Sequence, residues 1–456
     1  MQPRTIVSIE QDTEGALVAR LLKAESNLPN ARQSIPIGFD AGAIPAMDDE
    51  AKVQLYGALL RDALKKHPAI QSALSAMFQL PDGQSRALCF EIVALQGEQI
   101  RWEALCDDAG DFVALGGRCR VSRIADEVSR QDAGIRPFNL PLRICAFMSA
   151  AGRDATPEWT AFVSAFDGAR SAGLALEARV FVGQQQLLDR IRQELADGQH
   201  PGVTIASMPS SDLDVEGALN EYRPQLVHFF CHGSSGFGKA YLELATIVDH
   251  DTESVEGSVV VEVNSLVEAG GVRNAWLVVL NCCEGAAAGE RLASMAFRIV
   301  ANGSVPAVIG MQEPIPAGDA NVFCEKLYPE LFRLLSATAT ESLSKPVALD
   351  LTETLVPARR AIRNRHRKNP SSFHNWTLPV LYVQKEPLQV QCRPAESDEH
   401  LALMRDRVRL VAGLLRQLPP DADPALRAQF LGVLDKPPVV PPELRPDSMG
   451  QIPIGL

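Results

Sequence analysis

Two stretches of the sequence decide the fold: QLVHFFCHG, residues 225–233, and AWLVVLNCCEG, residues 275–285. Each is an apolar run of strand length that ends in reactive side chains and a glycine. Nearly continuous apolar runs of this kind are typical of strands buried on both faces of a parallel sheet. The two stretches therefore predict neighbouring central strands whose carboxyl ends carry the chemistry.

Outward from these strands, apolar runs alternate with helical patterns, which predicts a doubly wound, largely parallel α/β sheet flanked by helices. A longer insertion, residues 234–270, interrupts the alternation. The remaining predicted strands are LRICAFMSA (142–150), LALEARVFV (174–182), VPAVIGM (305–311) and WTLPVLYVQ (376–384), and the predicted helices are 156–173, 183–198, 289–303 and one after Pro316.

The chain is long enough for two or three packed units, since domains usually contain roughly 100–200 residues. Before the alternating region, strand patterns surround two helices over residues 48–78, which Pro68 separates. The segment RPFNLP, 136–141, is interpreted as a linker between two lobes. After residue 387 comes a helical pattern and then a Pro-rich tail. We predict an N-terminal lobe (1–136), a catalytic lobe (137–387) and a helical extension (388–456).

Composition argues against nucleic acid as the main partner, because Asp and Glu (56) outnumber Lys and Arg (44). The one basic run, RRAIRNRHRK at 359–368, is interpreted as a solvated helix face. The first residues lack the pattern of a secretory signal, and no apolar run approaches the length of a membrane span. We expect a cytoplasmic protein without a membrane partner.

The nine cysteines show no CxxC pattern and no His/Cys cluster at zinc spacing, so no metal or organic cofactor is predicted. Several lie inside apolar strands and are interpreted as small buried hydrophobes in a reducing compartment. Cys282 and Cys283 differ, because they end a strand.

Side chains just past the carboxyl ends of neighbouring parallel strands line the crevice where ligands bind. His232 and one of the two cysteines are therefore expected to face each other. An imidazole beside a thiol promotes formation of the nucleophilic thiolate. The backbone N–H groups of Gly233 and of the nucleophilic cysteine would form an oxyanion hole. The alternative interpretation is that these residues only pack, the role we predict for His228, which shares a strand face with His232.

The motifs VHFFCHG (227–233) and WLVVLNCCEGAAAG (276–289) resemble the His and Cys motifs of CHAT domains, caspase-like domains of peptidase clan CD related to separase. Three further segments resemble the same family: IRWEALCDDAGDFVAL (100–115), GSVPAVIGMQEP (303–314) and WTLPVLY (376–382). The resemblance covers roughly residues 1–385 and implies a caspase-like sheet preceded by a degenerate, non-catalytic caspase-like lobe.

The resemblance also assigns roles to residues. It makes His232 the general base, Gly233 an oxyanion-hole residue and Cys283 the nucleophile, with Cys282 as the alternative. Arginine-specific members of the clan have an Asp two residues before the nucleophile, where this chain has Asn281. Strict cleavage after Arg is therefore disfavoured, unless Asp212, Asp214 or Glu284 supplies the carboxylate instead.

Four residues form the predicted substrate-contacting set. Besides Asn281 it contains Glu284, Gln312 and Ser234. For Glu284 the alternative is a position in the first turn of the following helix. For Gln312, which follows a strand, the alternative is a place at the edge of the sheet.

These observations predict a cysteine endopeptidase. Because an unrestrained cytosolic protease is harmful and the resemblance implies regulated proteolysis, we expect it to be latent until a partner, a ligand or self-cleavage activates it. The resemblance implies that it cleaves a specific protein, encoded nearby, in bacterial defence or programmed cell death. Two alternatives stay open. The chain could be a catalytically silent interaction module, or His232 and the cysteine, the catalytic dyad, could catalyse acyl transfer to or hydrolysis of a small molecule.

Overall fold

The computed structural model describes residues 4–25, 28–39, 47–81, 83–125, 135–236, 238–254, 256–282, 294–302, 305–343, 345–392, 398–419, 422–435, 440 and 445–451. The chain forms two compact units, Met1–Cys392 and Arg393–Leu456. The first contains the large sheet and the described residues of the predicted site, and the described part of the second is largely helical.

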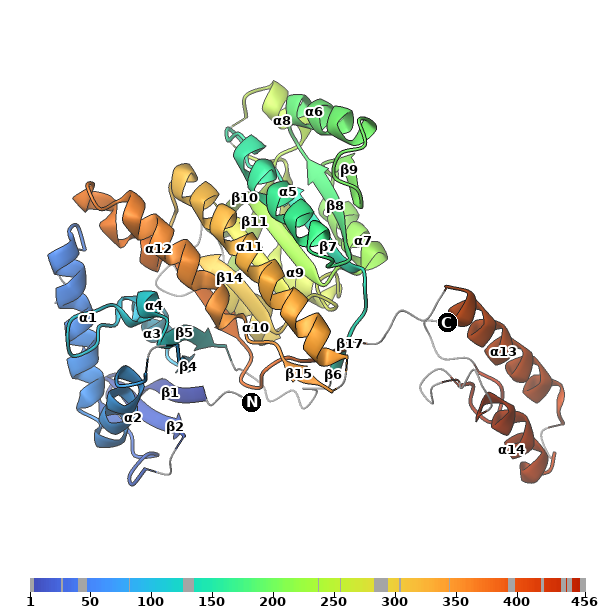
Figure 1. The fold of residues 1–456 in the computed structure, drawn as a ribbon, viewed down its shortest axis with the longest axis horizontal. Coiled ribbons are helices and arrows are strands. Elements are labelled where there is room, and N and C mark those ends of the chain that lie inside the picture. The colour runs from blue at the N-terminus through green and yellow to red at the C-terminus, as the bar shows by residue number, and fades with distance from the viewer. Residues whose placement is uncertain are drawn as a thin grey trace. The chain divides into compact units, whose positions relative to one another are not determined.

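A single large sheet runs through the first unit (Figure 1). Pairing is parallel except at three places: where β2 (Leu17–Lys23) joins its two neighbours, where β14 (Ala307–Met311) meets β16 (Pro379–Val383), and where β11 (Lys239–Leu244) joins β10 (Leu226–Gly236) and β12 (Val259–Glu262). This mostly parallel arrangement confirms the predicted fold class. In spatial order the strands are β3 (Ile35–Pro36), β2 (Leu17–Lys23), β1 (Arg4–Gln11), β4 (Arg86–Ile92), β5 (Cys119–Ile124), β16 (Pro379–Val383), β14 (Ala307–Met311), β13 (Leu277–Cys282), β10 (Leu226–Gly236), β7 (Leu142–Met148), β8 (Leu176–Val182) and β9 (Val203–Ser207).

Helices cover both faces of this sheet because the central strands are apolar on both sides. On β10, Phe230 packs into one hydrophobic cluster, whereas Val227 and Phe229 pack into the other. The first cluster includes side chains of α5 (Thr156–Ser171), α6 (Gln185–Ala196), α11 (Ala317–Ser342) and α12 (Leu355–Arg365). The second includes side chains of α7 (Asp212–Tyr222), α9 (Val263–Glu268) and α10 (Met295–Asn302). Figure 1 shows α5 and α11 side by side over the sheet.

The two helices predicted around Pro68 are confirmed as α1 (Glu50–Lys65) and α2 (Pro68–Phe78). Proline is tolerated in the first turn of a helix, where its missing N–H has no partner in any case. The imidazole of His67 accepts hydrogen bonds from the N–H groups of Ala69 and Ile70, which caps α2. The break between the helices is thus a capped boundary.

Two elements of the alternating region were not predicted, namely β9 and α7. β9 lies at the edge of the sheet, and its sequence, VTIAS, alternates too weakly to identify it as a strand. The insertion, residues 234–270, forms β11 (Lys239–Leu244), α8 (Ile247–Asp251), β12 (Val259–Glu262) and α9. β11 pairs with the end of β10, so the insertion extends the sheet beside the predicted site.

The predicted boundary at 136/137 falls within β6 (Ile135–Phe138), which pairs with β17 (Gln389–Cys392) in a small sheet completed by β15 (Val347–Ala348). The large sheet crosses from β5 to β16 without a break. The lobe division remains a prediction, whereas the compact units divide at 392/393, close to the predicted 387/388.

The basic side chains of the run at 359–368 are largely solvated, as interpreted from the sequence, except that Arg359 and His366 are buried. Arg359 is 1% exposed and donates two hydrogen bonds to the carbonyl of Pro379. Arg360 donates to the carbonyl of Leu115. The guanidinium groups join α12 to the backbone of neighbouring segments because five N–H donors can satisfy carbonyl oxygens that no strand pairs. The exposed basic side chains of the run, as predicted, are Arg360, Arg365, Arg367 and Lys368.

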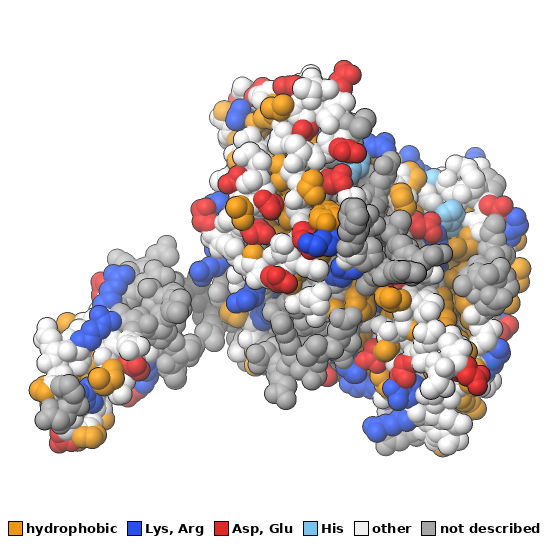
Figure 2. Space-filling view, turned by 180° about the vertical axis from the view of Figure 1, so that it is seen from behind, with side chains coloured by type: hydrophobic (Ala, Val, Ile, Leu, Met, Phe, Trp, Pro, Cys, Tyr) orange, Lys and Arg blue, Asp and Glu red, His pale blue; other side chains and the backbone are white. Residues whose placement is uncertain are grey.

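The second unit contains α13 (Asp398–Gln417) and α14 (Pro424–Gly432), as predicted for a helical extension. Its own hydrophobic cluster includes Met404, Val408 and Leu415. None of the helices in the described residues has the length and apolar character needed to cross a membrane. Over the first unit, acidic and basic side chains are interspersed on the face seen in Figure 2.

A buried ion pair joins β5 to the short helix η2 (Trp102–Ala104). Arg123 on β5 and Glu103 are both fully buried, and Arg123 Nη2 lies 2.7 Å from Glu103 Oε2. Arg123 also donates to the carbonyls of Glu98 and Ile100 and to the side chain of Gln312. Removing the arginine would leave a carboxylate buried without a charged partner.

We therefore expect Arg123→Met to lower the free energy of unfolding by about 3–5 kcal/mol, the usual cost of breaking a buried pair. Urea unfolding followed by circular dichroism measures this loss. The matched control is Arg190→Met in the exposed pair with Glu194, whose loss should cost less than about 1 kcal/mol. Equal effects in the two variants would contradict the buried pair's importance.

A second buried contact fixes the insertion to the end of β7. The hydroxyl of Ser149 donates to the carbonyl of Ala245 and lies 3.0 Å from Nε2 of His250. Only glycine fits at position 183, since a Cβ there would lie 2.1 Å from that hydroxyl oxygen. Burial lowers the pKa of His250, and the nearby Asp249 only partly opposes this shift.

The lowered pKa of His250 predicts a pH-dependent stability. Below a pH of about 6.5 the unfolded chain takes up a proton that folded His250 does not, so stability falls as the pH falls. We expect His250→Gln to lose less stability than wild type between about pH 7.5 and pH 5.5, as measured by urea unfolding at each pH. An unchanged pH dependence in this variant would exclude His250 as a contributor.

Candidate functional site

The predicted catalytic histidine lies where β10 changes its partner. Along its first part β10 pairs in parallel with β13, and the register ends with Cys231 opposite Cys282. At His232 the pairing changes to β11, where His232 is opposite Glu243. The carboxyl ends of β10 and β13 therefore meet at one edge of the sheet, as the sequence predicted.

The hydrogen bonding of His232 defines which ring nitrogen can accept a proton. The residue is 9% exposed, and its Nε2 lies 2.7 Å from the carbonyl oxygen of Ala151. Because a carbonyl only accepts, Nε2 carries the proton in this contact, which leaves a lone pair on Nδ1 of the neutral ring. Nδ1 is buried and has no hydrogen-bond partner among the described residues. The imidazole is thus oriented with one basic nitrogen available.

The other predicted catalytic residues are described only in part. Gly233 is buried and pairs with Leu242 of β11, and half-buried Ser234 pairs with Tyr241. Cys283 and Glu284 lie outside the described residues, and β13 is described up to Cys282. The choice between Cys282 and Cys283 therefore remains a prediction, as does the oxyanion hole.

The two remaining predicted substrate contacts, Asn281 and Gln312, are engaged within the protein. Asn281 is fully buried and donates through Nδ2 to Glu158 Oε1 at 3.0 Å. Gln312 donates through Nε2 to the carbonyls of residues 98–100 and accepts from Arg123. Their substrate-contacting role remains a prediction that no observed contact supports.

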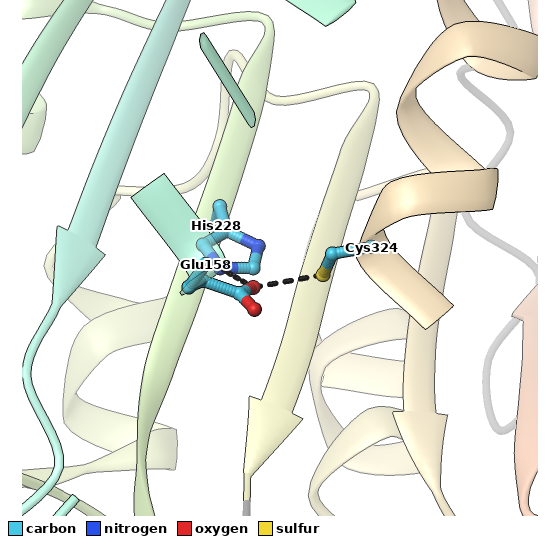
Figure 3. Close-up of side chains that lie close together, drawn as sticks. All are labelled: Glu158, His228 and Cys324. Carbon is cyan, nitrogen blue, oxygen red and sulfur yellow. Dashed lines mark hydrogen bonds and ion pairs between the residues drawn. The ribbon is translucent and has the colours of Figure 1, made fainter. Parts of the chain in front are cut away.

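A buried polar cluster beneath His232 was not predicted from the sequence. It consists of Glu158 on α5, His228 on β10 and Cys324 on α11 (Figure 3). The amide of Asn281 lies beside it. All three residues of the cluster are at most 1% exposed. Glu158 Oε1 lies 2.8 Å from His228 Nε2 and accepts a hydrogen bond from Cys324 Sγ at 2.8 Å. The predicted core position of His228 is confirmed, but its partners are polar.

Tyr328 on α11 closes one side of this cluster. Its ring packs edge-on against the imidazole of His228, with centroids 5.7 Å apart. Burial, together with nearby Cys324 and Glu158, raises the pKa of Tyr328 well above its usual value, so the phenol stays protonated. The cluster is therefore buried, with an aromatic ring on one side.

The sequence contains no pattern that predicts the cluster of Glu158, His228 and Cys324. Glu158 reads as an ordinary acidic residue in the first turn of a helix, and Cys324 as one apolar position of an amphipathic helix. Residues 158, 228 and 324 are far apart in the chain, and only the crossing of α5 and α11 over β10 brings their side chains together. A groove of about 1030 Å³ on the outer side of α5 and α11 includes none of them.

Comparison with known proteins identifies the family. The family model of the CHAT domain matches residues 50–383, most of the chain and nearly all of the resemblance seen in the sequence. None of the curated proteins matches the chain. The matched range spans the sheet from β4 to β16, including β10 with His232 and β13, which leads to the Cys282–Cys283 pair. The chain therefore belongs to the CHAT domain family, a caspase-like family related to proteases.

Proposed function

We propose that this protein is a cysteine endopeptidase with His232 as general base and Cys283 as nucleophile. Nδ1 of His232 accepts the thiol proton, and the thiolate attacks the carbonyl carbon of a substrate peptide bond. The imidazolium returns the proton to the leaving amine, and water then hydrolyses the thioester. Each turnover consumes one water and regenerates the thiol.

The observation that carries this proposal is the state of the His232 ring. Its Nε2 is held by Ala151, and its Nδ1 has no hydrogen-bond partner in the described part of the chain. A general base must have a lone pair within reach of the proton that it removes. The described register of β10 and β13 ends one residue before His232 and Cys283, which supports Cys283 as the source of that proton.

The oxyanion of the tetrahedral intermediate needs N–H donors that are already oriented. We assign them to the backbone of Gly233 and Cys283. Gly233 follows the general base directly in β10, and its lack of a Cβ leaves its amide approachable from the side of the substrate. The amide of Asn281 is engaged with Glu158, which supports a specificity other than strict cleavage after Arg.

The isolated chain is proposed to be latent. Nδ1 of His232 is both unpartnered and buried, so substrate cannot reach it without a rearrangement. The insertion pairs with the end of β10 through β11, so its movement would change the surroundings of His232. A partner protein or self-cleavage would supply that change, and the proposed target is one specific protein in bacterial defence or programmed cell death.

Covalent labelling tests the dyad. After co-expression with proteins encoded beside it, treatment with a peptidyl electrophile should add one adduct to the wild-type chain, detected by intact-mass spectrometry. We expect no adduct in Cys283→Ala and labelling about 10²-fold slower or more in His232→Ala, because the general base is lost. The matched controls are Cys282→Ala, which removes the neighbouring thiol, and His250→Gln.

Labelling that persists in Cys283→Ala but disappears in Cys282→Ala would move the nucleophile by one residue. Labelling that is absent from wild type, even after co-expression with proteins encoded beside it, would favour the silent interaction module.

Co-expression also tests latency. If a neighbouring protein activates the enzyme, labelling of the wild-type chain should be faster in its presence, and the target should be cut with wild type but not with Cys283→Ala. Gel electrophoresis of the co-expressed pair measures cleavage. Full-rate labelling of the isolated chain would contradict latency while leaving the peptidase assignment intact.

A further inference from the structure

The buried cluster of Glu158, His228 and Cys324 contains three kinds of metal ligand. The donor atoms are a carboxylate oxygen, an imidazole nitrogen and a thiol sulfur, and all lie within 4.8 Å of one another. They project from α5, β10 and α11 towards one point, as Figure 3 shows. Oxygen, nitrogen and sulfur donors of these types are the ligands that Zn²⁺ uses in proteins.

Several donor atoms in the cluster form no hydrogen bond with the described residues and could bind a ligand. Oε2 of Glu158 and both ring nitrogens of His228 are buried and form no hydrogen bond within the described residues. His228 Nε2 lies 2.8 Å from Glu158 Oε1 but does not point a hydrogen bond at it. A buried polar atom without a partner destabilises the folded chain, because it has lost its hydrogen bonds to water. A cation bound by their lone pairs would satisfy these atoms.

The negative charge of buried Glu158 also favours a bound cation. Among the described residues Glu158 has no Lys or Arg partner, and its only ion-pair contact is with His228. A carboxylate that is 0% exposed is costly unless a positive charge balances it. When a metal binds, the Cys324 thiol releases its proton to solvent and becomes a thiolate. One carboxylate and one thiolate then carry two negative charges, which a divalent cation neutralises.

We propose that Glu158, His228 and Cys324 bind a Zn²⁺ ion. A thiolate with an imidazole selects Zn²⁺ over Mg²⁺ or Ca²⁺, which prefer oxygen ligands. The fourth ligand is the Oδ1 of Asn281, which is buried without a hydrogen-bond partner in the described structure. Its amide already contacts the cluster through Nδ2, at 3.0 Å from Glu158 and 3.4 Å from Cys324. Turning the amide over places the oxygen on the metal side.

The geometry needs only a modest adjustment. Zn–O and Zn–N bonds of about 2.0–2.2 Å and a Zn–S bond of about 2.3 Å place tetrahedral donors roughly 3.3–3.7 Å apart. The two shortest donor separations, from Glu158 Oε1 to His228 Nε2 and to Cys324 Sγ, are both 2.8 Å. An outward shift of less than about 1 Å, by rotation of side chains, admits the ion.

The role of this ion would be structural, because the cluster is buried and offers no position for substrate. It would tie α5 and α11 to β10, four residues before His232, and through Asn281 to the end of β13. The sequence predicted no metal, since these ligands are separated by 70 and 96 positions (158 to 228, 228 to 324). The inference does not depend on the proposed peptidase activity.

Metal analysis of the full chain tests the site. The background is the Cys282→Ala/Cys283→Ala double variant, so that the predicted dyad cannot bind the metal. After purification without affinity metal or chelator, plasma mass spectrometry should find about one Zn²⁺ per chain. Co²⁺ added to the apoprotein should give thiolate-to-cobalt charge-transfer absorption.

Cys324→Ala and His228→Ala in this background should lose both signals. The matched control is Cys145→Ala, which removes another fully buried thiol from the opposite face of the sheet. The unaltered cluster provides a test that does not depend on a variant folding: Zn²⁺ added to the apoprotein should raise its melting temperature. A folded chain that contains no zinc, binds no Co²⁺ and melts at the same temperature with and without Zn²⁺ would overturn the proposal.

Discussion

The parallel pairing of β10 with β13 is the constraint on which the rest of this structure depends. The two strands are apolar on both faces, so each must be covered by helices on both sides and by strands at both edges. This requirement places α5 and α11 over one face, α7, α9 and α10 over the other, and β7 and β14 alongside. Because parallel strands end at the same edge, it also brings His232 close to the end of β13.

The sequence predicted the elements whose pattern is local. Apolar runs identified β7, β8, β10, β13 and β14, since a strand buried on both faces needs no partner to be recognised. β9 and α7 were missed because an edge strand and a weakly amphipathic helix carry little periodic signal. The direction of β16 was also beyond local pattern: it runs antiparallel to β14, which depends on how the chain returns across the sheet.

The site was predictable to the same extent. His232 follows a strand, and the family resemblance supplied its role, but nothing in the sequence showed that Ala151 would fix its tautomer. Gln312 also follows a strand, yet its side chain joins the Arg123 network instead of an open cleft. A position at a strand end therefore predicts where a residue lies, whereas the partners that decide what it does come from segments distant in sequence.

His228 and His232 show how far the surroundings determine the chemistry of one side chain. Both lie on the same face of β10, four residues apart. His232 has a backbone carbonyl as partner, which leaves one nitrogen basic and suits it to move a proton. His228 lies among a carboxylate, a thiol and an amide, where a cation is a better match than a proton. Asn281 contacts the cluster around His228 and lies two residues before Cys283 in the sequence. Ordering of that cluster would therefore affect the position of the end of β13.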